Sequence, residues 1–316
     1  MTGRHGHGGH AHGGHSHGLA PSGNHRGPLA LVLAITVANF VAQVVGAVMS
    51  GSLALLADAG HMLTDVMGLV LALVAAQLMT RAASDRRTWG FVRAEVLSAA
   101  GQAIVLTAVA CYVIVEGERR MVHPPPIGAG TMLVFGVVGL LGNAVAIAIL
   151  LRSRTANLNL RAAFLEVVND ALGSVAVIVA AVVVATTGWL RADALVSLLV
   201  GALILPRAVL ILRDAAGVLL ESAPKGLDLA DVRRHLLETP HVHDVHDLHA
   251  SQMATGLPVL SAHVVVDDTC FNDGHLPSML DAVQRCVADH FPVSIEHSTF
   301  QFEPVSHVDH ERATHA

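Results

Sequence analysis

Charged residues are scarce in this chain of 316 residues, and long hydrophobic stretches take their place. Asp, Glu, Lys and Arg together make up 14% of the sequence, whereas hydrophobic residues make up 53% and the mean hydropathy is +0.57. This composition indicates a protein that crosses the membrane several times and carries a smaller soluble part. The net charge of −6 indicates no nucleic-acid partner.

Several other features are absent, and each absence excludes a class of protein. Only three cysteines occur (Cys111, Cys270 and Cys286), without a pairing pattern, which fits a reducing compartment. The first residues lack the apolar core of a cleavable signal peptide. No phosphate-binding Gly-x-x-x-x-Gly-Lys-Ser/Thr loop occurs, and no nucleophile is paired with a base. We therefore expect neither nucleotide hydrolysis nor another enzyme activity, and no cofactor.

The hydrophobic residues are gathered into segments long enough to cross a bilayer. A spanning helix needs about 20 mostly apolar residues, because the hydrocarbon core is about 30 Å thick. Six segments qualify, at residues 29–50, 53–80, 94–115, 128–151, 162–187 and 193–213. After Pro224 no segment is long enough. The expected fold is an α-helical polytopic membrane protein with a C-terminal cytoplasmic domain.

Arginine and lysine are unevenly shared between alternate loops, and this bias predicts the orientation in the membrane. One side receives Arg4, Arg26, Arg81, Arg86, Arg87, Arg93, Arg152, Arg154, Arg161, Arg213 and Lys225. The other side receives only Arg119, Arg120 and Arg191. We therefore expect a multi-pass protein of the cell membrane with both termini in the cytoplasm.

Two of the six spans carry pairs of ionisable residues. His61 and Asp65 lie in the second span, and Glu166 and Asp170 lie in the fifth. A spacing of four residues places both members of a pair on one helix face. Ionisable groups are costly inside a membrane, so a functional site is expected where they occur. If the two pairs face each other, they form a four-ligand cage of nitrogen and oxygen for a divalent cation.

A plainer interpretation is that polar residues in the spans only form hydrogen bonds between helices. We favour that interpretation for the isolated Asn39, Gln43 and Asn143. Asp58, three residues before His61, stays ambiguous: it either supports the ligand or caps and orients the start of its span. Two pairs at ligand spacing are harder to explain in this way, because unpaired carboxylates in apolar surroundings repel one another.

The ligand types also predict a mechanism. Imidazole and carboxylate suit Zn²⁺, although Co²⁺ and Ni²⁺ accept the same donors. The ligands must lose their protons to bind a metal, so binding releases protons. Reprotonation of the same residues on the return path would give an antiport of metal cations out of the cytoplasm against H⁺.

The N-terminal residues 1–27 form a tract rich in glycine and histidine. Such a tract cannot bury a core, so we expect it to be disordered in the cytoplasm. It either traps metal weakly near the mouth of the transporter or is a low-complexity end that transport does not need. The candidate ligands of the trap are His5, His7, His10, His12, His15 and His17.

The expected membrane domain covers residues 28–215, the cytoplasmic domain residues 216–304, and a disordered tail residues 305–316. Within the cytoplasmic domain, helical patterns occur at 227–237 and 276–290, and strand patterns occur at 242–252, 257–266 and 293–302. This αββαβ order predicts an α+β, ferredoxin-like sandwich of one open sheet and two helices.

Histidines are scattered over this predicted domain, and most are expected to be surface residues: His241, His243, His249, His275 and His297. His246 and His263 fall on strands that are expected to be neighbours. These two histidines could bind a regulatory metal ion, with Glu303 or His297 as a further ligand.

The run of residues 50–65, SGSLALLADAGHMLTD, resembles the second-span signature of the zinc-transporting branch of the cation diffusion facilitator family. Residues 91–97, 157–161, 245–249 and 260–266 are also similar to that family, and the resemblance extends from about residue 29 to 304. It implies a homodimeric Zn²⁺/H⁺ antiporter whose transport site is formed by His61, Asp65, Glu166 and Asp170. It also implies metal binding at His246 and His263 in the cytoplasmic domain.

One position departs from the family pattern. Zinc-transporting members usually carry histidine where this chain has Glu166. A carboxylate makes the site harder and changes which group carries the returning proton. Glu166 either joins the ligands or turns away and leaves three ligands and a water. Alternative functions are therefore an exporter that prefers cobalt, nickel or cadmium, or a membrane metal sensor or scaffold that does not transport.

Overall fold

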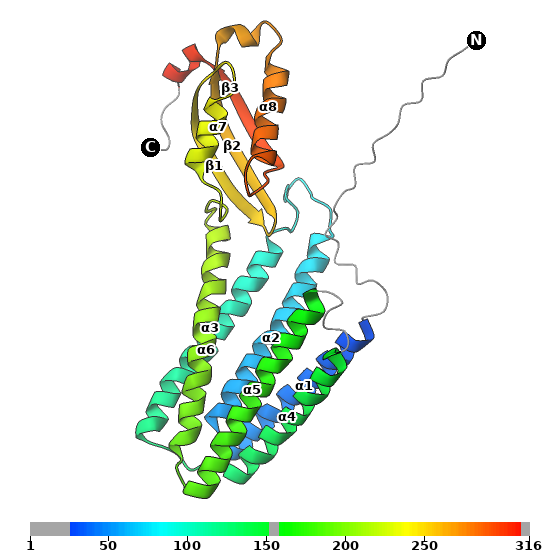
Figure 1. The fold of residues 1–316 in the computed structure, drawn as a ribbon, viewed down its shortest axis with the longest axis vertical. Helices are drawn as coiled ribbons and strands as arrows, with labels where there is room; N and C mark the ends of the chain where they lie inside the picture. Colours follow the sequence, from blue (N-terminus) through cyan, green and yellow to red (C-terminus); the bar gives the residue numbers. More distant parts are fainter. Residues whose placement is uncertain (1–25, 152–157, 311–316) are drawn as a thin grey trace, which may run out of the picture.

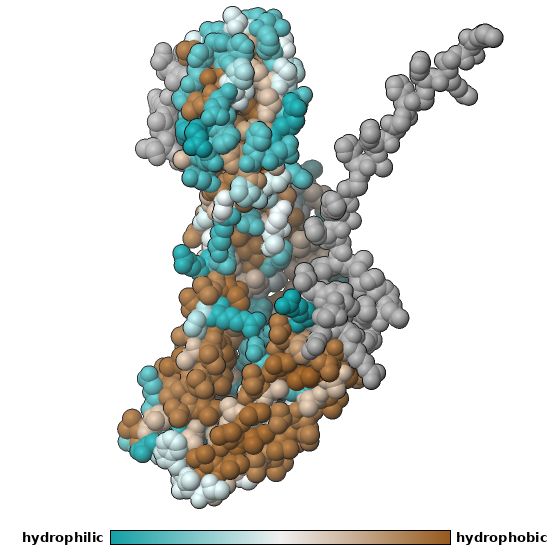
Figure 2. Space-filling model, in the orientation of Figure 1, coloured by the Kyte–Doolittle hydropathy of each residue, from teal (hydrophilic) through white to brown (hydrophobic). Residues whose placement is uncertain are grey.

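The computed structural model describes residues 26–151 and 158–310. Its first part contains six long helices: α1 (Arg26–Ser50), α2 (Leu53–Met79), α3 (Ala94–Val122), α4 (Ala129–Leu151), α5 (Leu158–Thr187) and α6 (Arg191–Leu219). All six are long and apolar enough to cross a membrane, which confirms the six predicted spans. Figure 2 shows the wide apolar surface that this bundle presents. The helix α6 continues beyond residue 215, where we expected the membrane domain to end.

The helices pack in close pairs, because small residues let their backbones approach. α3 packs against α6 around Ala110 and Ala208, both fully buried. α4 packs against α5 and α1, and α2 lies between α1 and α3. In Figure 1, the α3–α6 pair stands beside the group formed by α1, α2, α4 and α5. The candidate ligands are therefore carried by helices from the middle of the bundle.

The start of α2 is fixed by a residue of α6. Gly51 makes the reversal after α1 with a φ of 71°, and Ser52 caps α2 by accepting a hydrogen bond from the Leu55 amide. The Asp193 carboxylate accepts three more hydrogen bonds, from Ser52 Oγ at 2.5 Å and from the amides of Leu53 and Ala54 at 2.8 and 3.1 Å. These amides have no partner within their own helix, so a buried carboxylate stabilises this helix end.

The C-terminal domain has the predicted αββαβ order. It comprises α7 (Leu229–Leu237), β1 (Val242–Ala254), β2 (Leu257–Val266), η1 (Asp268–Phe271), α8 (Leu276–Asp289), β3 (His297–Pro304) and η2 (Val305–His310). The strands lie in the order β1-β2-β3, with β1 antiparallel and β3 parallel to β2. The helices cover one face of the sheet over a core that includes Val232, Val264 and Val283. The ferredoxin-like prediction is thus confirmed.

Two details of the domain differ from the prediction. The third strand begins at His297 and not at residue 293, because the buried Ile295 packs into the core and its amide donates to the carbonyl of Val287 in α8. Residues 305–310 were expected to be disordered, but they form η2. The amide of Val305 donates a hydrogen bond to Asp268 Oδ1 at 2.9 Å, which fixes the beginning of this turn.

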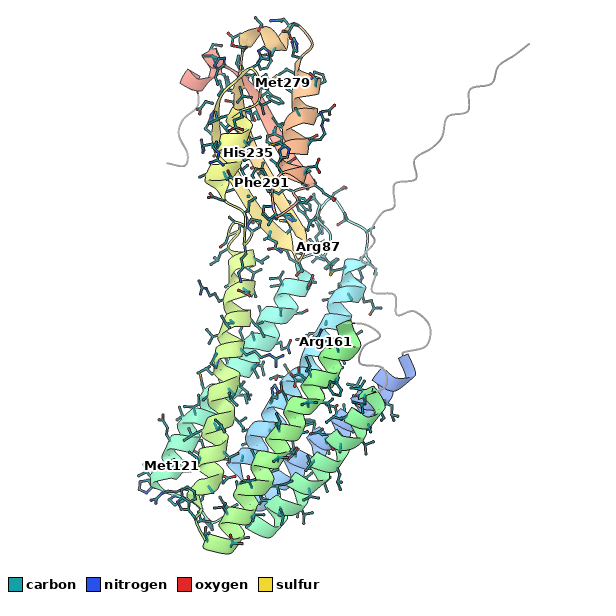
Figure 3. All side chains as sticks on the ribbon, in the orientation of Figure 1. Arg87, Met121, Arg161, His235, Met279 and Phe291 are labelled. Atoms are coloured by element: carbon teal, nitrogen blue, oxygen red, sulfur yellow. The ribbon has the colours of Figure 1, made fainter. Side chains whose placement is uncertain are left out.

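The C-terminal domain contacts the bundle through the segment between α2 and α3. Arg93 Nη2 lies 2.8 Å from Glu221 Oε1, and the ring of Trp89 meets the ring of His297 edge-on, with 4.8 Å between centroids. Figure 3 shows Arg87 at this junction and Met121 at the opposite end of the bundle. The arginines of the loop between α2 and α3 therefore lie at the end of the bundle that faces the C-terminal domain.

Candidate metal transport site

The structure brings the four predicted ligands of the spans together. The Nε2 atom of His61 lies 3.6 Å from Asp65 Oδ2 on its own helix and 3.7 Å from Glu166 Oε1 on α5. His61, Asp65 and Asp170 each offer one ligand atom, and these three atoms lie within 4.8 Å of one another. The two helices run in opposite directions (Figure 1), and the side chains of the two i,i+4 pairs meet between them.

Several polar atoms of this cluster are buried and lack a hydrogen-bond partner among the described residues. They are Nδ1 of His61, Oδ2 of Asp65 and Oδ1 of Asp170. Asp170 is only 4% exposed. A buried polar atom without a partner is costly, and a bound cation would satisfy the two carboxylate oxygens at once. The donor set, one imidazole and neighbouring carboxylates, is therefore that of a site for a divalent cation.

Glu166 is the most exposed member of the cluster, at 32%, and it faces two partners. One is His61, and the other is Arg207 of α6, whose Nη1 lies 3.5 Å from Glu166 Oε1. Sequence reasoning missed Arg207. The available signal was a cationic residue inside the sixth apolar span, where an ionisable group calls for a partner. Glu166 does not turn away from the cluster, but its charge is shared with an arginine.

Asp58 proves to be a partner between helices and not a helix cap, since Ser52 caps α2. Its Oδ2 accepts a hydrogen bond from Gln43 Nε2 of α1 at 2.9 Å. A Cβ added to Gly173 of α5 would lie 2.8 Å from Asp58 Oδ1, so only glycine allows this close approach. Asp58 thereby ties α1, α2 and α5 together one turn from His61.

A second polar contact lies beside it. Asn39 Nδ2 donates to Asn143 Oδ1 at 3.0 Å, and Asn143 Nδ2 donates to Ser174 Oγ at 3.4 Å. Ser174 follows Asp170 by one helical turn. The isolated polar residues thus form hydrogen bonds between helices and hold α1, α4 and α5 in register next to the ligands.

Access to the cluster differs between its two ends. His61 lies about 12 Å along α2 from Leu53, at about 1.5 Å per residue. Around that end of α2, the side chains of Leu53, Leu55 and Val177 are at most 1% exposed. Toward the C-terminal domain, Asp65 and Glu166 are partly exposed. Figure 2 shows a hydrophilic strip between the apolar surfaces in this half of the bundle. Packed apolar side chains therefore cover the cluster toward Leu53, whereas Asp65 and Glu166 are partly exposed toward the C-terminal domain.

The predicted cluster of the C-terminal domain also comes together. Glu303 of β3 is 2% exposed, and its carboxylate oxygens lie 2.8 Å from His263 Nδ1 and 3.5 Å from His246 Nε2. The register pairs His246 with His263 across β1 and β2. His297, the other candidate for this cluster, instead contacts Trp89. The tail histidines, from His5 to His17, lie outside the described residues.

Fold and site together define a multi-pass membrane protein with a candidate cation site in its bundle. Comparisons with known proteins agree with this class. The cation efflux transmembrane domain matches residues 29–220, and the cytoplasmic domain of cation efflux proteins matches residues 224–305. The chain belongs to the cation efflux family, whose members are transporters and not enzymes.

Curated relatives cover nearly the whole chain. It is 41% identical to the metal cation efflux system protein CzcD of Cupriavidus metallidurans, over 90% of this chain and 88% of that protein. It is 40% identical to the zinc transporter ZitB of Escherichia coli, over 90% and 89% of the two chains. It is 34% identical to a cadmium, cobalt and zinc/H(+)-K(+) antiporter of Bacillus velezensis, over 90% of each chain.

Proposed function

We propose that this protein exports divalent metal cations, with Zn²⁺ as the principal cargo, in exchange for protons. One observation carries the proposal: buried imidazole and carboxylate atoms that lack a hydrogen-bond partner among the described residues converge between α2 and α5, inside the membrane bundle. His61, Asp65 and Asp170 are the proposed central ligands, and Glu166 is the fourth. The names of the relatives, which include zinc transport and antiport with H⁺, support the same cargo and exchange.

The proposed cycle uses the ligands as proton carriers. A cation enters from the side of the C-terminal domain, where Asp65 and Glu166 are partly exposed, and displaces the protons held by the cluster. The bundle then closes on this side and opens near Leu53, and the cation leaves. Protons from outside replace it on the imidazole and carboxylates, and the protonated site returns to the cytoplasmic face. Alternating access of one site thus couples the two fluxes.

The Glu166–Arg207 pair bears on the choice of ion. An arginine beside the fourth ligand withdraws part of its negative charge, which keeps the site close to the charge of a set with a histidine at this position. This supports zinc over a harder cation. Cobalt, nickel and cadmium accept the same donors and remain the alternative cargo.

The proposal extends to the location, assembly and regulation of the protein. The protein would lie in the plasma membrane with both termini in the cytoplasm and act as a homodimer through its C-terminal domain. Metal bound to His246, His263 and Glu303 would regulate transport, and the histidines of the tail would gather metal near the entrance. The proposed domain limits are those predicted from the sequence, except that the membrane part extends to the end of α6 and the cytoplasmic domain includes η2.

Metal uptake into proteoliposomes under an imposed pH gradient tests the proposal. Protein oriented with its C-terminal domain outside should accumulate Zn²⁺ when the lumen is acidic, and collapse of the gradient should abolish the accumulation. Asp170→Ala should reduce the rate to the level of empty vesicles, because it removes a buried ligand. Parallel assays with Co²⁺, Ni²⁺ and Cd²⁺ rank the cargo.

Asn169→Ala provides the matched control, since this neighbouring residue is exposed on α5. Its transport should equal that of the wild type. Uptake that ignores the pH gradient would contradict the antiport, and full transport by Asp170→Ala would contradict the site.

A further inference from the structure

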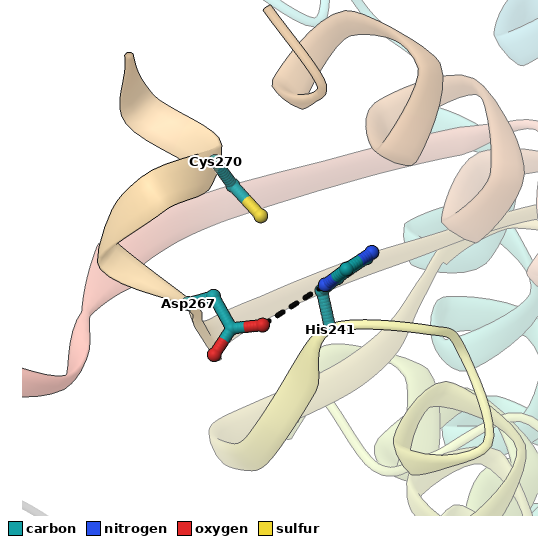
Figure 4. A group of neighbouring side chains, drawn as sticks. All are labelled: His241, Asp267 and Cys270. Atoms are coloured by element: carbon teal, nitrogen blue, oxygen red, sulfur yellow. Dashed lines mark hydrogen bonds and ion pairs between the residues drawn. The ribbon is translucent and has the colours of Figure 1, made fainter. Parts of the chain in front are cut away.

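A third group of metal-binding side chains lies at the end of the C-terminal domain farthest from the bundle, by the short helix η1 at the top of Figure 1. His241 precedes β1, Asp267 follows β2, and Cys270 lies within η1. One ligand atom from each lies within 4.8 Å of the other two. Figure 4 shows the Cys270 thiol directed toward His241 and Asp267, whose Nδ1 and Oδ2 atoms are 2.9 Å apart.

The backbone of the domain holds these three residues in place. Val242 pairs with Val266 at the end of the β1–β2 ladder, so residues 241 and 267 face each other just beyond it. The Asp267 amide donates a hydrogen bond to the His241 carbonyl at 3.2 Å, and the Cys270 amide donates to the Asp267 carbonyl at 3.0 Å. His241 has a φ of 69°, a backbone conformation that residues other than glycine rarely adopt. The surrounding contacts therefore constrain its backbone.

Two more histidines surround the group. His243 Nε2 lies 2.6 Å from Asp267 Oδ1, and a shift in strand register between Val242 and Asp244 leaves His243 unpaired in the ladder and free to take this position. The His275 ring lies 5.6 Å from that of His241, between centroids. Asp267 therefore accepts from two imidazoles, which lowers the pKa of its carboxyl.

This group is chemically distinct from the other two clusters. Neither the transport ligands nor the cluster of His246, His263 and Glu303 contains a thiol. Cys270 is 1% exposed, and burial raises the pKa of its thiol. When this protonated thiol coordinates a metal ion beside the imidazole and the carboxylate, it becomes a thiolate and releases its proton to the solvent.

We propose that His241, Asp267 and Cys270 form a binding site for Zn²⁺ or a similar borderline cation in the cytoplasmic domain. A set of one nitrogen, one oxygen and one sulfur suits tetrahedral Zn²⁺, with His243 or a water as fourth ligand. Bonds of about 2.0–2.3 Å place tetrahedral donors roughly 3–4 Å apart, so the present spacing needs only side-chain rotation. The bound ion would tie the start of β1 to η1.

Co²⁺ binding to the full-length protein in detergent tests this site independently of transport. A thiolate bound to Co²⁺ produces charge-transfer absorption in the near ultraviolet, which nitrogen and oxygen ligands do not produce. The histidine tail and the other two clusters contain no thiol, so Co²⁺ bound there does not contribute to this absorption band. We expect the band in the wild type and its loss in Cys270→Ser. Added Zn²⁺ should displace Co²⁺ and remove the band.

The other cysteines provide matched controls. Cys111→Ser/Cys286→Ser leaves Cys270 as the only thiol, and this double variant should keep the full band. His241→Ala changes an exposed side chain and should weaken Co²⁺ binding by about tenfold or more, as loss of a ligand or its close partner does. Absence of the band from the folded wild type or double variant would overturn the proposal, as would its persistence in Cys270→Ser.

Discussion

At the scale of single residues, the proposed transport site contains more carboxylates than its imidazole alone can balance. Three carboxylates, Asp65, Glu166 and Asp170, surround His61. Arg207 supplies a positive charge at the edge of this group, 3.5 Å from Glu166. Its side chain is half exposed, so solvent weakens the pair, but it contacts the proposed fourth ligand directly. Arg207 is therefore expected to tune how strongly the site holds a cation.

Replacement of Arg207 by glutamine tests this role. The lost positive charge should strengthen cation binding, and the KM for Zn²⁺ uptake should fall about two- to fivefold, the range expected for an ion pair worth up to about 1 kcal/mol. Release of Zn²⁺ from the more tightly binding site would become slower, so kcat should fall or stay constant. The measurement is initial Zn²⁺ uptake into proteoliposomes over a range of metal concentrations.

Arg213→Gln is the control for this measurement, because it removes an arginine from the same helix farther from the ligands. It should leave KM unchanged. An unchanged KM in Arg207→Gln would show that Arg207 does not influence the ion, and an increased KM would contradict the expected sign of its effect.

At the scale of elements, α2 depends on α6 for its first turn. Asp193 is fully buried and accepts hydrogen bonds from Ser52 Oγ and from the amides of Leu53 and Ala54. Arg120 of α3 is close to the same carboxylate, at 3.9 Å. Because α2 carries His61 and Asp65, this cap also sets the position of the ligands. It lies at the end of the bundle where packed apolar side chains cover the cluster.

We expect Asp193→Ala to destabilise the bundle by about 2–3 kcal/mol. A buried, charged hydrogen-bond acceptor contributes more to stability than the side chain of an ordinary helix cap. For a chain of this size, the midpoint of thermal unfolding in detergent should fall by about 4–10 °C. Asp193→Asn keeps one acceptor oxygen and should show a smaller decrease.

Asp214→Ala tests whether any aspartate of α6 has the same effect. Asp214 is exposed and pairs with Lys225, and such pairs contribute roughly 0–1 kcal/mol. Equal midpoints for Asp193→Ala and the wild type would refute the capping role.

At the scale of the whole molecule, the C-terminal domain and the bundle meet at few side-chain contacts. Arg93, just before α3, pairs with Glu221, and its guanidinium also lies 3.4 Å from Met253 Sδ of β1. Trp89 contacts His297 of β3. The segment between α2 and α3 therefore joins the domain to the bundle, together with α6, which continues toward the domain and contacts β1.

Charge reversal at this junction should slow transport. Arg93→Glu and Glu221→Arg each place like charges opposite each other, and we expect each to lower the Zn²⁺ transport rate about two- to fivefold, the effect of up to about 1 kcal/mol. The double reversal restores opposite charges and should recover most of the rate. Proteoliposome uptake at saturating Zn²⁺ measures all three variants.

Arg86→Glu, an exposed change in the same segment, controls for altered loop charge and should transport normally. If the double variant is no faster than the single variants, the pair does not couple the domain to the bundle.

Much of this architecture follows from local features of the sequence. The six spans are long apolar segments, and a span is recognised by its length and composition alone. The strands and helices of the C-terminal domain follow from periodicity; most boundaries lie within two residues of the prediction, and the largest difference is the start of the third strand, at His297 and not at residue 293. The transport ligands could be proposed because each pair lies within one helix, where a spacing of four residues determines a common face.

The partners of these residues depend on tertiary packing and could not be derived from the sequence. Asp58 meets Gln43, Asp193 caps α2, and Arg207 reaches Glu166 only because of the way in which the helices pack. His241, Asp267 and Cys270 meet for a similar reason, since the register of β1 and β2 brings distant segments side by side. The sequence by itself determined the elements and the ligand pairs, because both rest on local spacing. Tertiary structure decided which charges face which, because that depends on contacts between segments far apart in the chain.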